Sequence, residues 1–523
     1  MRRVLVLVAT LAVVLAATAA AVRGDTVVGH GGGTPGTAKH FRLVGHDPLF
    51  ARGMNAAIAL YDTGERTYVY VGNRTDGQAK HPHPGILIVD TTTPSDPAVV
   101  GEIPASVAAP NAAGTPEGVT SRELRVWPQK KLLIELTFRC SSVIHDCPPG
   151  NDTTFPFDYK FFDLGDPVHP RLIGRHVTRS QAGTAIKPHE FYLWIDPKDG
   201  ARALLWESTP SSSTDPSRPN FVIEDISDVP DGGPVRLVAQ GNWNNQFEDG
   251  GAPAAYDLDL AVHSMTPTFD GTVTHMAYLR GEYLALDTSK VANGEVLPGA
   301  VENLNDDLIT DPANRPRWGA GNHCGGHTAE GCSESHSSVP VPGRPYVLNV
   351  DEVYGSFTTP SFGWPWGWVR LIGVSDPTHP QIVGEYKIHE NTTAYVPDPV
   401  TEQFTSYSSH NPAVLPKLAF DAWHSGGLQA INIADPTHPT QAGWFSPTPL
   451  ASVATEDPAL SRGPNKVVMW SFPIIHDGLV YVVDIRNGVY ILEYRGAHAG
   501  AVKKIHFYES NSNLGDAGRL AGT

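Results

Sequence analysis

Two nearly identical stretches, about sixty positions apart, constrain the fold of this chain more than any other feature. They read VRLIGVSDPTHPQIVGEY from Val369 and LQAINIADPTHPTQAGWF from Leu428. Each begins with an apolar run that predicts a β-strand, continues through a turn rich in Asp, Thr and Pro, and ends in a second apolar run. The Asp-Pro and His-Pro steps disfavour a helix, because proline fixes its own φ and restricts the residue before it. The pattern therefore predicts a repeated β architecture.

Further copies of this strand-turn-strand unit occur along the chain. Clear copies start at Gly85 (GILIVDTTTPSDPAVVGEI) and Tyr159 (YKFFDLGDPVHPRLIGRH), weaker ones at Asn220 and Gly281, and a shortened one, NGVYILEY, at Asn487. With the two copies above, these make seven units at a period of roughly sixty residues. Space for two more strands precedes each copy. Four short antiparallel strands per unit, without helical periodicity, predict an all-β, seven-bladed β-propeller.

The ends of the chain suggest how such a ring closes. The stretch FRLVGHDPLF, from Phe41, resembles the final strand of a unit, but no earlier part of that unit precedes it. We therefore expect it to complete the seventh blade beside the C-terminal VYILEY. The predicted organisation is a signal peptide (1–24), a flexible Gly-rich linker (25–40), the propeller (41–495) and a C-terminal tail (496–523). The tail either adds an edge strand, VKKIHFYE, or stays disordered.

The first residues predict export. Met1-Arg2-Arg3 precedes an apolar run from Val4 to about Ala17 and a series of small residues, which is typical of a cleaved secretory signal peptide. No later segment approaches the ~20 apolar residues of a membrane-spanning helix. We expect a secreted, extracellular or periplasmic protein without a membrane span after cleavage. The net charge of −17 argues against nucleic acid as a partner.

The four cysteines form two local pairs, Cys140 with Cys147 and Cys324 with Cys332. In an exported chain, two loop-closing disulfides are the expected arrangement. The second loop also contains histidines, so a Cys/His metal site is the alternative.

Histidine recurs at the start of five units. These residues are His189, His263, His336, His410 and His476. The first strand of each propeller blade borders the central channel, so their imidazoles are candidate ligands for a transition metal such as copper, zinc or iron. Glu190 or Glu123 would add a carboxylate. The alternative is structural, with each histidine holding a turn of its own blade. His275 and His424, which lie one strand later, are interpreted as packing residues.

The strand-turn pattern resembles the LVIVD repeat, a propeller-forming motif of exported bacterial proteins. The resemblance rests on LIVDTTTPSDPAVVG, FFDLGDPVHPRLIG, LIGVSDPTHPQIVG and INIADPTHPTQAG, and on the step AFDAWHSGGLQAI before the last of them. It covers most of the mature chain and implies the fold, whereas propellers host unrelated activities. Two units depart from the pattern: Gly373 and Asn432 replace the aspartate found at Asp90, Asp163, Asp225 and Asp287.

Two functions from different classes follow. The first is an exported binding or scaffold protein for an unknown protein, small-molecule or glycan ligand, with the tryptophans of GWPWGW, from Gly363, as one platform. The second is a metal-dependent oxidoreductase with a histidine-ringed channel. Selenium-binding and methanethiol-oxidase propellers resemble this chain distantly, in architecture and in the use of histidine for metal. No hydrolase elbow, zinc-protease motif or nucleotide fingerprint is present.

Overall fold

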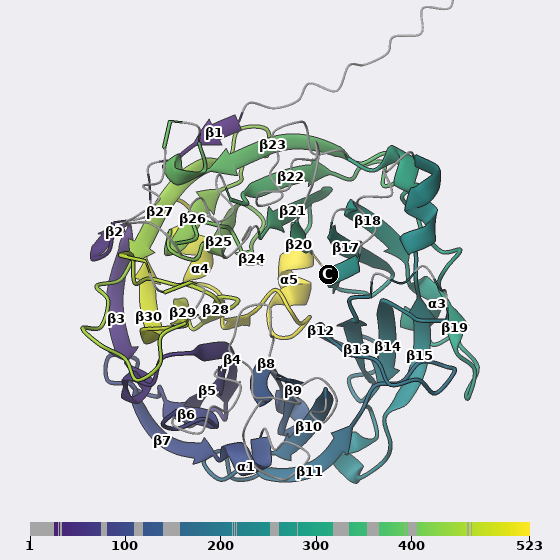
Figure 1. Ribbon diagram of the computed structural model, residues 1–523, viewed down its shortest axis with the longest axis horizontal. Coiled ribbons are helices and arrows are strands. Elements are labelled where there is room, and N and C mark those ends of the chain that lie inside the picture. Colours follow the sequence, from purple (N-terminus) through teal and green to yellow (C-terminus); the bar gives the residue numbers. More distant parts are fainter. Residues whose placement is uncertain are drawn as a thin grey trace, which may run out of the picture.

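A ring of β-sheets surrounds a central axis in the computed structural model (Figure 1). The structure describes residues 26–522 except 30, 32–33, 75–80, 109–118, 140–156, 212, 214, 216, 251–260, 280, 317–333, 353–365, 393, 396–404, 458–459 and 462. Within these residues, no helix is both long and apolar enough to cross a membrane.

The largest sheet combines two consecutive antiparallel strand groups. Its strands are β4 (Asn55–Asp62), β5 (Thr67–Asn73), β6 (Ile86–Asp90) and β7 (Ala98–Ile103), then β8 (Val119–Trp127), β9 (Leu132–Arg139), β10 (Asp158–Asp163) and β11 (Arg171–His176). One residue pair, Asn73 with Ser121, joins the groups. Within each group, every strand pairs with the next along the chain. Each group is therefore one four-stranded propeller blade.

The next two sheets differ in strand number. The third group contains β12 (Glu190–Ile195), β13 (Ala203–Ser208), β14 (Phe221–Asp225) and β15 (Arg236–Gly241), and the fourth contains β16 (Ala261–Pro267), β17 (Val273–Leu279) and β18 (Glu282–Asp287). After β18 the chain forms the short helix α3 (Ser289–Ala292), and β19 (Glu302–Asn303) then pairs in parallel with β15. The fourth strand expected there is absent from the described sheet. Pro298 has no backbone N–H to donate to a neighbouring strand, and Gly294 and Gly299 adopt positive φ, so this stretch does not continue the sheet.

The last three groups include strands from both ends of the chain. The fifth group contains β20 (Ser335–Pro340), β21 (Tyr346–Asp351), β22 (Val369–Gly373) and β23 (Gln381–Lys387). The sixth contains β24 (Asn411–Val414), β25 (Leu418–Ala422), β26 (Leu428–Asn432) and β27 (Thr440–Ser446). The seventh contains β28 (Ile474–His476), β29 (Leu479–Asp484), β30 (Gly488–Tyr494) and β3 (Phe41–Asp47). If the largest sheet is counted as two groups, the described residues contain seven strand groups in a ring. The predicted β-propeller is confirmed.

The N-terminal strand closes the ring as predicted. β3 pairs antiparallel with β30, so the last sheet contains strands from both ends of the chain. The segment expected as a flexible linker (25–40) is partly structured, because β1 (Thr26–Val28) pairs with β23 and β2 (Thr37–Lys39) pairs with β27. β23 and β27 are the outer strands of their blades, so one edge of each offers backbone N–H and C=O groups. The short strands β1 and β2 form hydrogen bonds with part of these edges.

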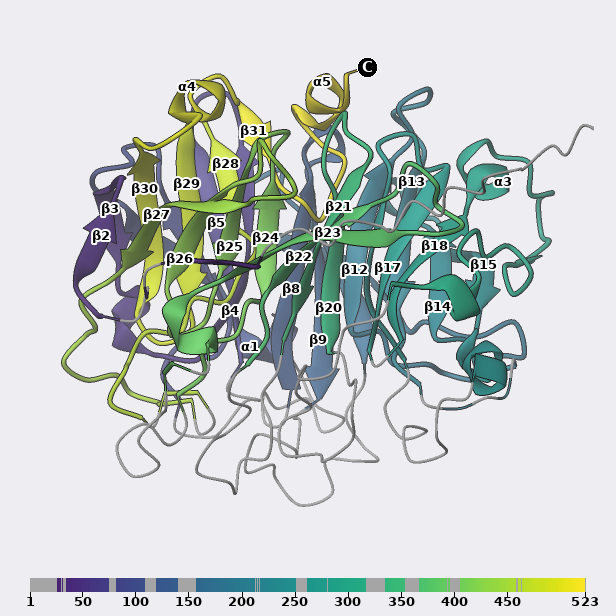
Figure 2. The same cartoon turned by 90° about the horizontal axis from the view of Figure 1, so that it is seen from above.

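The C-terminal tail lies on one face of the ring and reaches its centre (Figures 1 and 2). β31 (Phe507–Tyr508) pairs with β28, and the helices α4 (Ala499–Val502) and α5 (Ala517–Ala521) flank it on the same face. The tail therefore adds a strand, but on the inner edge of a blade. Beyond β31, the amide of Leu193 donates to the carbonyl oxygen of Asn511 (3.2 Å), and Ser510 accepts from the amide of Val414 (3.0 Å). The tail thus bridges blades on different sides of the channel.

The repeated turn has a mechanical role in the ring. In the two quoted copies, Asp376 and Asp435 each accept a hydrogen bond from the backbone amide two residues later, which fixes the turn. The spacing shared by the copies then places the glycine of one blade against the turn of the next. A Cβ atom at Gly384 would overlap the carbonyl oxygen of Pro436, and Gly45 lies in the same way against Pro94. The repeated unit recurs because each copy fits its neighbour.

Replacing Gly384 with alanine is therefore expected to destabilise the propeller by at least about 2 kcal/mol, because the added methyl group forces neighbouring blades apart. Urea unfolding of the mature protein measures this loss. The matched control is Gly174→Ala, where the nearest atom to a new Cβ belongs to the Phe161 side chain at 3.5 Å. Equal stability of the two variants would contradict the role assigned to the glycine.

A buried cluster of charged side chains lies inside the second blade. Glu135 in β9 pairs in register with Lys160 in β10, and both residues are fully buried. The Lys160 ammonium donates to Asp158 (2.7 Å) and to Thr137. Neither carboxylate oxygen of Glu135 has a hydrogen-bond partner among the described residues. Burial raises the pKa of Glu135 to about 8, against which the nearby Lys160 acts only partly.

This raised pKa predicts a pH dependence of stability. The folded state holds a proton on Glu135 that the unfolded state releases near its ordinary pKa of 4.5. The stabilising contribution is complete below pH 4.5 and is lost as the pH rises toward 8, by at most about 1.4 kcal/mol per pH unit. Glu135→Gln removes this dependence.

We expect the difference in unfolding free energy between the wild-type protein and the Glu135→Gln variant to change in favour of the variant from pH 5 to pH 8. Urea unfolding at pH 5, 6.5 and 8 measures it. Parallel pH profiles of the two proteins would show that Glu135 titrates alike in the folded and unfolded states.

Candidate metal centre

Four of the five predicted histidines meet in the central channel. His189 and His410 immediately precede β12 and β24, and His263 and His336 lie in the first three residues of β16 and β20. These first strands line the axis of the ring (Figure 1). The Nε2 atoms of His189 and His263 are 3.0 Å apart. The ring centroids of His263 and His336 are 3.9 Å apart, and those of His336 and His410 are 4.3 Å apart. The imidazoles thus form a continuous row across four blades.

His476 lies apart from this row. It is the last residue of β28, whereas the other four precede their strands or lie near the strand starts, so its side chain emerges at the opposite end of the channel. Its Nε2 atom is 3.1 Å from Oδ2 of Asp62. In its blade, Trp470 takes the place of the channel histidine. The indole ring lies 3.9 Å from the ring of His410, centroid to centroid.

Two further side chains complete the row, and neither belongs to the predicted ligand set. Glu352 directly follows β21, and His424 follows β25 after one intervening residue. Oε1 of Glu352 is 3.0 Å from Nε2 of His424 and 3.2 Å from Nε2 of His410. Oε2 of the same carboxylate is 3.6 Å from Nε2 of His336. One carboxylate therefore faces three imidazoles.

Antiparallel pairing explains why these two positions reach the channel histidines. The end of a second strand lies beside the start of the first strand, as the pairs Ser335 with Asp351 and Asn411 with Ala422 show. One of the first two residues after the second strand is therefore a second channel position in these two units. Comparing these positions between units would have identified Glu352 from the sequence as a candidate ligand, and it would have moved His424 from the packing residues to the candidate ligands.

Glu190 and Glu123, the predicted carboxylate partners, are both buried beside the row. Oε1 of Glu190 is 3.8 Å from Nε2 of His336. Burial and the neighbouring Glu123 raise the pKa of Glu190 to about 8. Glu123 pairs instead with Arg125, at 3.3 Å. Glu190 can thus approach a bound ion, whereas Glu123 is held by arginine.

Burial keeps the row of imidazoles neutral. It lowers the pKa of His263 to about 4 and that of His410 to about 3, and it lowers the pKa of His189 and His336 well below the ordinary value. A neutral imidazole presents one nitrogen lone pair. These side chains are therefore in the protonation state that binds metal.

The hydrogen bonds of the outer nitrogens orient the imidazoles. Nδ1 of His410 donates to the carbonyl oxygen of Trp470 (2.7 Å), which can only accept, so Nε2 carries the lone pair. That lone pair faces Oε1 of Glu352, another acceptor. Nδ1 of His336 lies 2.8 Å from the hydroxyl of Ser337, and its Nε2 makes no hydrogen bond with a described residue. Acceptor atoms that face one another in a buried site require a cation or a proton between them.

Three overlapping groups of ligand atoms follow from this geometry. Within each group, one ligand atom per residue lies within 4.8 Å of the others; the groups are His189, Glu190 and His263; His263, His336 and Glu352; and Glu352, His410 and His424. Imidazole nitrogen and carboxylate oxygen suit zinc, copper, iron and nickel. Because Glu352 belongs to two groups, its carboxylate can serve one ion or bridge two.

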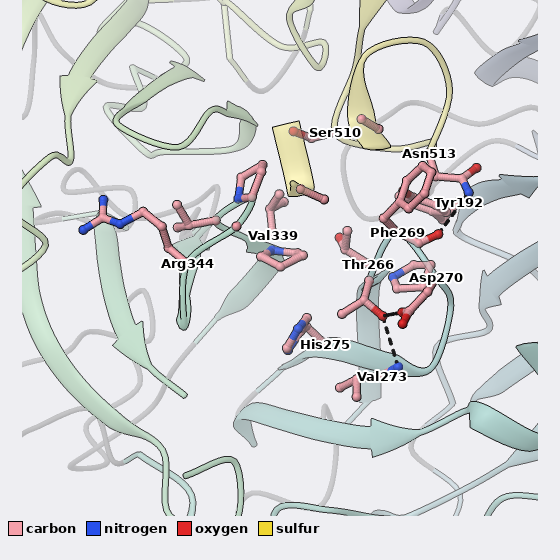
Figure 3. Close-up of a pocket in the computed structure, with 18 of the residues that line it drawn as sticks. Tyr192, Thr266, Phe269, Asp270, Val273, His275, Val339, Arg344, Ser510 and Asn513 are labelled. Atoms are coloured by element: carbon pink, nitrogen blue, oxygen red, sulfur yellow. Dashed lines mark hydrogen bonds between the residues drawn. The ribbon is translucent and has the colours of Figure 1, made fainter. Parts of the chain in front are cut away.

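A separate cavity of about 460 Å³ lies between the fourth and fifth blades and the C-terminal tail (Figure 3). Phe269, Val339 and Tyr192 give it a largely apolar wall, and no histidine of the channel row lines it. His275 faces this cavity rather than the channel, with Nδ1 2.7 Å from the hydroxyl of Tyr283. It has no place in the metal centre.

The remaining predicted features fall in two classes. Trp366 and Trp368 of the GWPWGW segment are buried against the fifth blade, so neither offers a platform to a partner. Trp364, the signal segment and Cys140, Cys147, Cys324 and Cys332 lie outside the described residues.

No protein-family model matches the sequence, and no curated protein matches it. A solved structure, the Cps50 (Swd1) β-propeller domain of Myceliophteria thermophila, aligns with 88% of this chain and 99% of its own, at 11% identity and a TM-score of 0.42. At that score the likeness carries no argument, and the β-propeller rests on the sheet topology above.

Proposed function

We propose that this protein is an exported β-propeller of the LVIVD-repeat type that holds a transition metal in its central channel for oxidoreductase chemistry. One observation carries the proposal: Oε1 of Glu352 lies 3.2 Å and 3.0 Å from the Nε2 atoms of His410 and His424. Two imidazoles and one carboxylate are the ligands of non-haem iron oxygenases, and the same donors bind zinc in hydrolytic enzymes. Three protein ligands leave positions open for substrate.

The neighbouring residues support this ligand set. His336 approaches the second oxygen of Glu352, and His263 packs on His336. Among the metals that these donors suit, iron and copper change oxidation state, and we therefore favour them for the proposed chemistry.

Buried polar groups favour the metal over a binding or scaffold role alone. His336 and His410 are almost completely buried, and the Glu352 side chain is only 7% exposed. Burying a carboxylate beside imidazoles costs stability that apolar side chains of the same volume would not cost. A protein that used only its outer surfaces would gain nothing from this arrangement, whereas a metal ion compensates for it.

Export and the repeat family support the wider setting of the proposal. The N-terminal sequence has the charged, apolar and small-residue regions of a secretory signal, and the repeated turns follow the LVIVD pattern.

Metal analysis tests the proposed centre directly. The mature protein, purified without chelators and reconstituted with iron, copper or zinc, is expected to retain the metal. We expect His410→Ala and Glu352→Gln each to weaken the affinity for the metal at least tenfold, because each variant removes one of three ligands. Elemental analysis after dialysis gives the stoichiometry, and the electron paramagnetic resonance spectrum of the copper-loaded protein reports nitrogen ligation.

The matched control is a double variant, His379→Ala with His438→Ala. These histidines occupy the repeated Asp-Pro-Thr-His-Pro turns and are more than half exposed, so their removal should leave channel metal unchanged. Circular dichroism checks that each variant keeps its β structure. A reconstituted wild-type protein whose metal content does not depend on His410 or Glu352 would overturn the proposal.

A further inference from the structure

A second cluster of metal-ligating side chains lies at the opposite end of the channel, where the first blade, the last blade and the C-terminal tail meet. Asp62 is the last residue of β4, His476 is the last residue of β28, and His506 directly precedes β31. Residues more than four hundred positions apart are thus side by side. Ring closure and the tail create this cluster, since no two of the three belong to the same segment.

The ligand atoms have the separations of a metal site. Nε2 of His476 is 3.1 Å from Oδ2 of Asp62, and Nε2 of His506 is 3.8 Å from the same oxygen. The three ligand atoms all lie within 4.8 Å of one another. With bonds of 2.0 to 2.1 Å, the ligand atoms of a tetrahedral zinc ion are ~3.3 Å apart. Small side-chain movements would therefore complete the geometry.

Neighbouring groups orient two of these ligands from outside. Nδ1 of His506 lies 2.6 Å from Oδ1 of Asp477, which directs Nε2 toward Asp62. Oδ1 of Asp62 accepts from the amide of Gly64 (2.7 Å), which leaves Oδ2 for the two histidines. In zinc sites, the ring nitrogen of a ligating histidine that does not bind the metal usually donates a hydrogen bond to a carboxylate or a carbonyl oxygen, as Nδ1 of His506 does to Asp477.

Exposure of the cluster allows an ion to enter. The side chains of His506 and Asp477 are 70% and 64% exposed, whereas that of His476 is 4% exposed and forms the base of the site. The Nδ1 atom of His476 has no hydrogen-bond partner among the described residues. Two imidazoles and one carboxylate, with the remaining coordination positions open to water, suit a divalent transition-metal ion of intermediate softness such as Zn²⁺.

We propose that Asp62, His476 and His506 bind a divalent transition-metal ion, with Zn²⁺ as the probe, and that Asp477 positions His506. The bound ion connects His506 of the tail to Asp62 in the first blade and His476 in the last blade, so it stabilises the closed ring. This site shares no residue with the channel centre and does not depend on its occupancy.

Zinc titration of the chelator-treated mature protein tests the proposal. We expect His506→Ala and Asp62→Asn each to weaken Zn²⁺ binding at this site at least tenfold, and to abolish the rise in melting temperature that the ion produces there. His506 is mostly exposed, so its variant should fold normally. Carrying out the titration in a background with both His263→Ala and His410→Ala breaks all three ligand groups of the channel, so failure of the channel proposal leaves this measurement intact.

His379→Ala is the matched control, because His379 also pairs with an exposed aspartate, Asp376 at 3.4 Å, but belongs to no three-ligand group among the described residues. It should bind Zn²⁺ like the wild-type protein. If the background protein binds no Zn²⁺, or if His506→Ala and Asp62→Asn leave its isotherm and melting temperature unchanged, the cluster is a simple ion pair and the proposal is overturned.

Discussion

The fit of one blade against the next is the constraint on which the rest of the structure depends. A glycine near the middle of the fourth strand, such as Gly384, lies against a carbonyl oxygen in the turn of the following blade. This close approach holds neighbouring sheets at a fixed spacing, so their first strands converge on a common axis. The row of channel imidazoles is a consequence, because residues from four blades can touch only if the blades keep this spacing.

Much of this architecture was predictable because the repeat carries its own periodicity. The strand-turn-strand units, the closure by β3 and the convergence of His189, His263, His336 and His410 all follow from comparing equivalent positions. His476 was misplaced, because it lies near the start of its unit in sequence but at the end of the short strand β28. Glu352 and His424 were missed as members of the channel cluster, because their proximity to the channel histidines depends on strand pairing, which a comparison of first strands does not include. The three-stranded fourth sheet departs from the repeat where glycine and proline interrupt it.

The channel combines features that oppose stability with features that favour chemistry. Several ionisable groups of the channel are buried in the protein. Burial lowers the pKa of the imidazoles, which keeps them neutral. The tail, hydrogen-bonded to β12 and β24, crosses the channel on one face. The ionisable groups are thus held by many segments at once, which is the rigidity that a ligand set needs.

Ring closure by segments far apart in the sequence also constrains when the last sheet can form. β3 is synthesised long before its partner β30, and the pair Arg42 with Glu493 spans 451 positions. Until β30 is made, β3 lacks its partner strand in the last blade, and joining such distant segments carries a loop-closure entropy that local pairs avoid. The other blades can therefore form from local strand pairs, whereas the last sheet can form only after β30 has been synthesised.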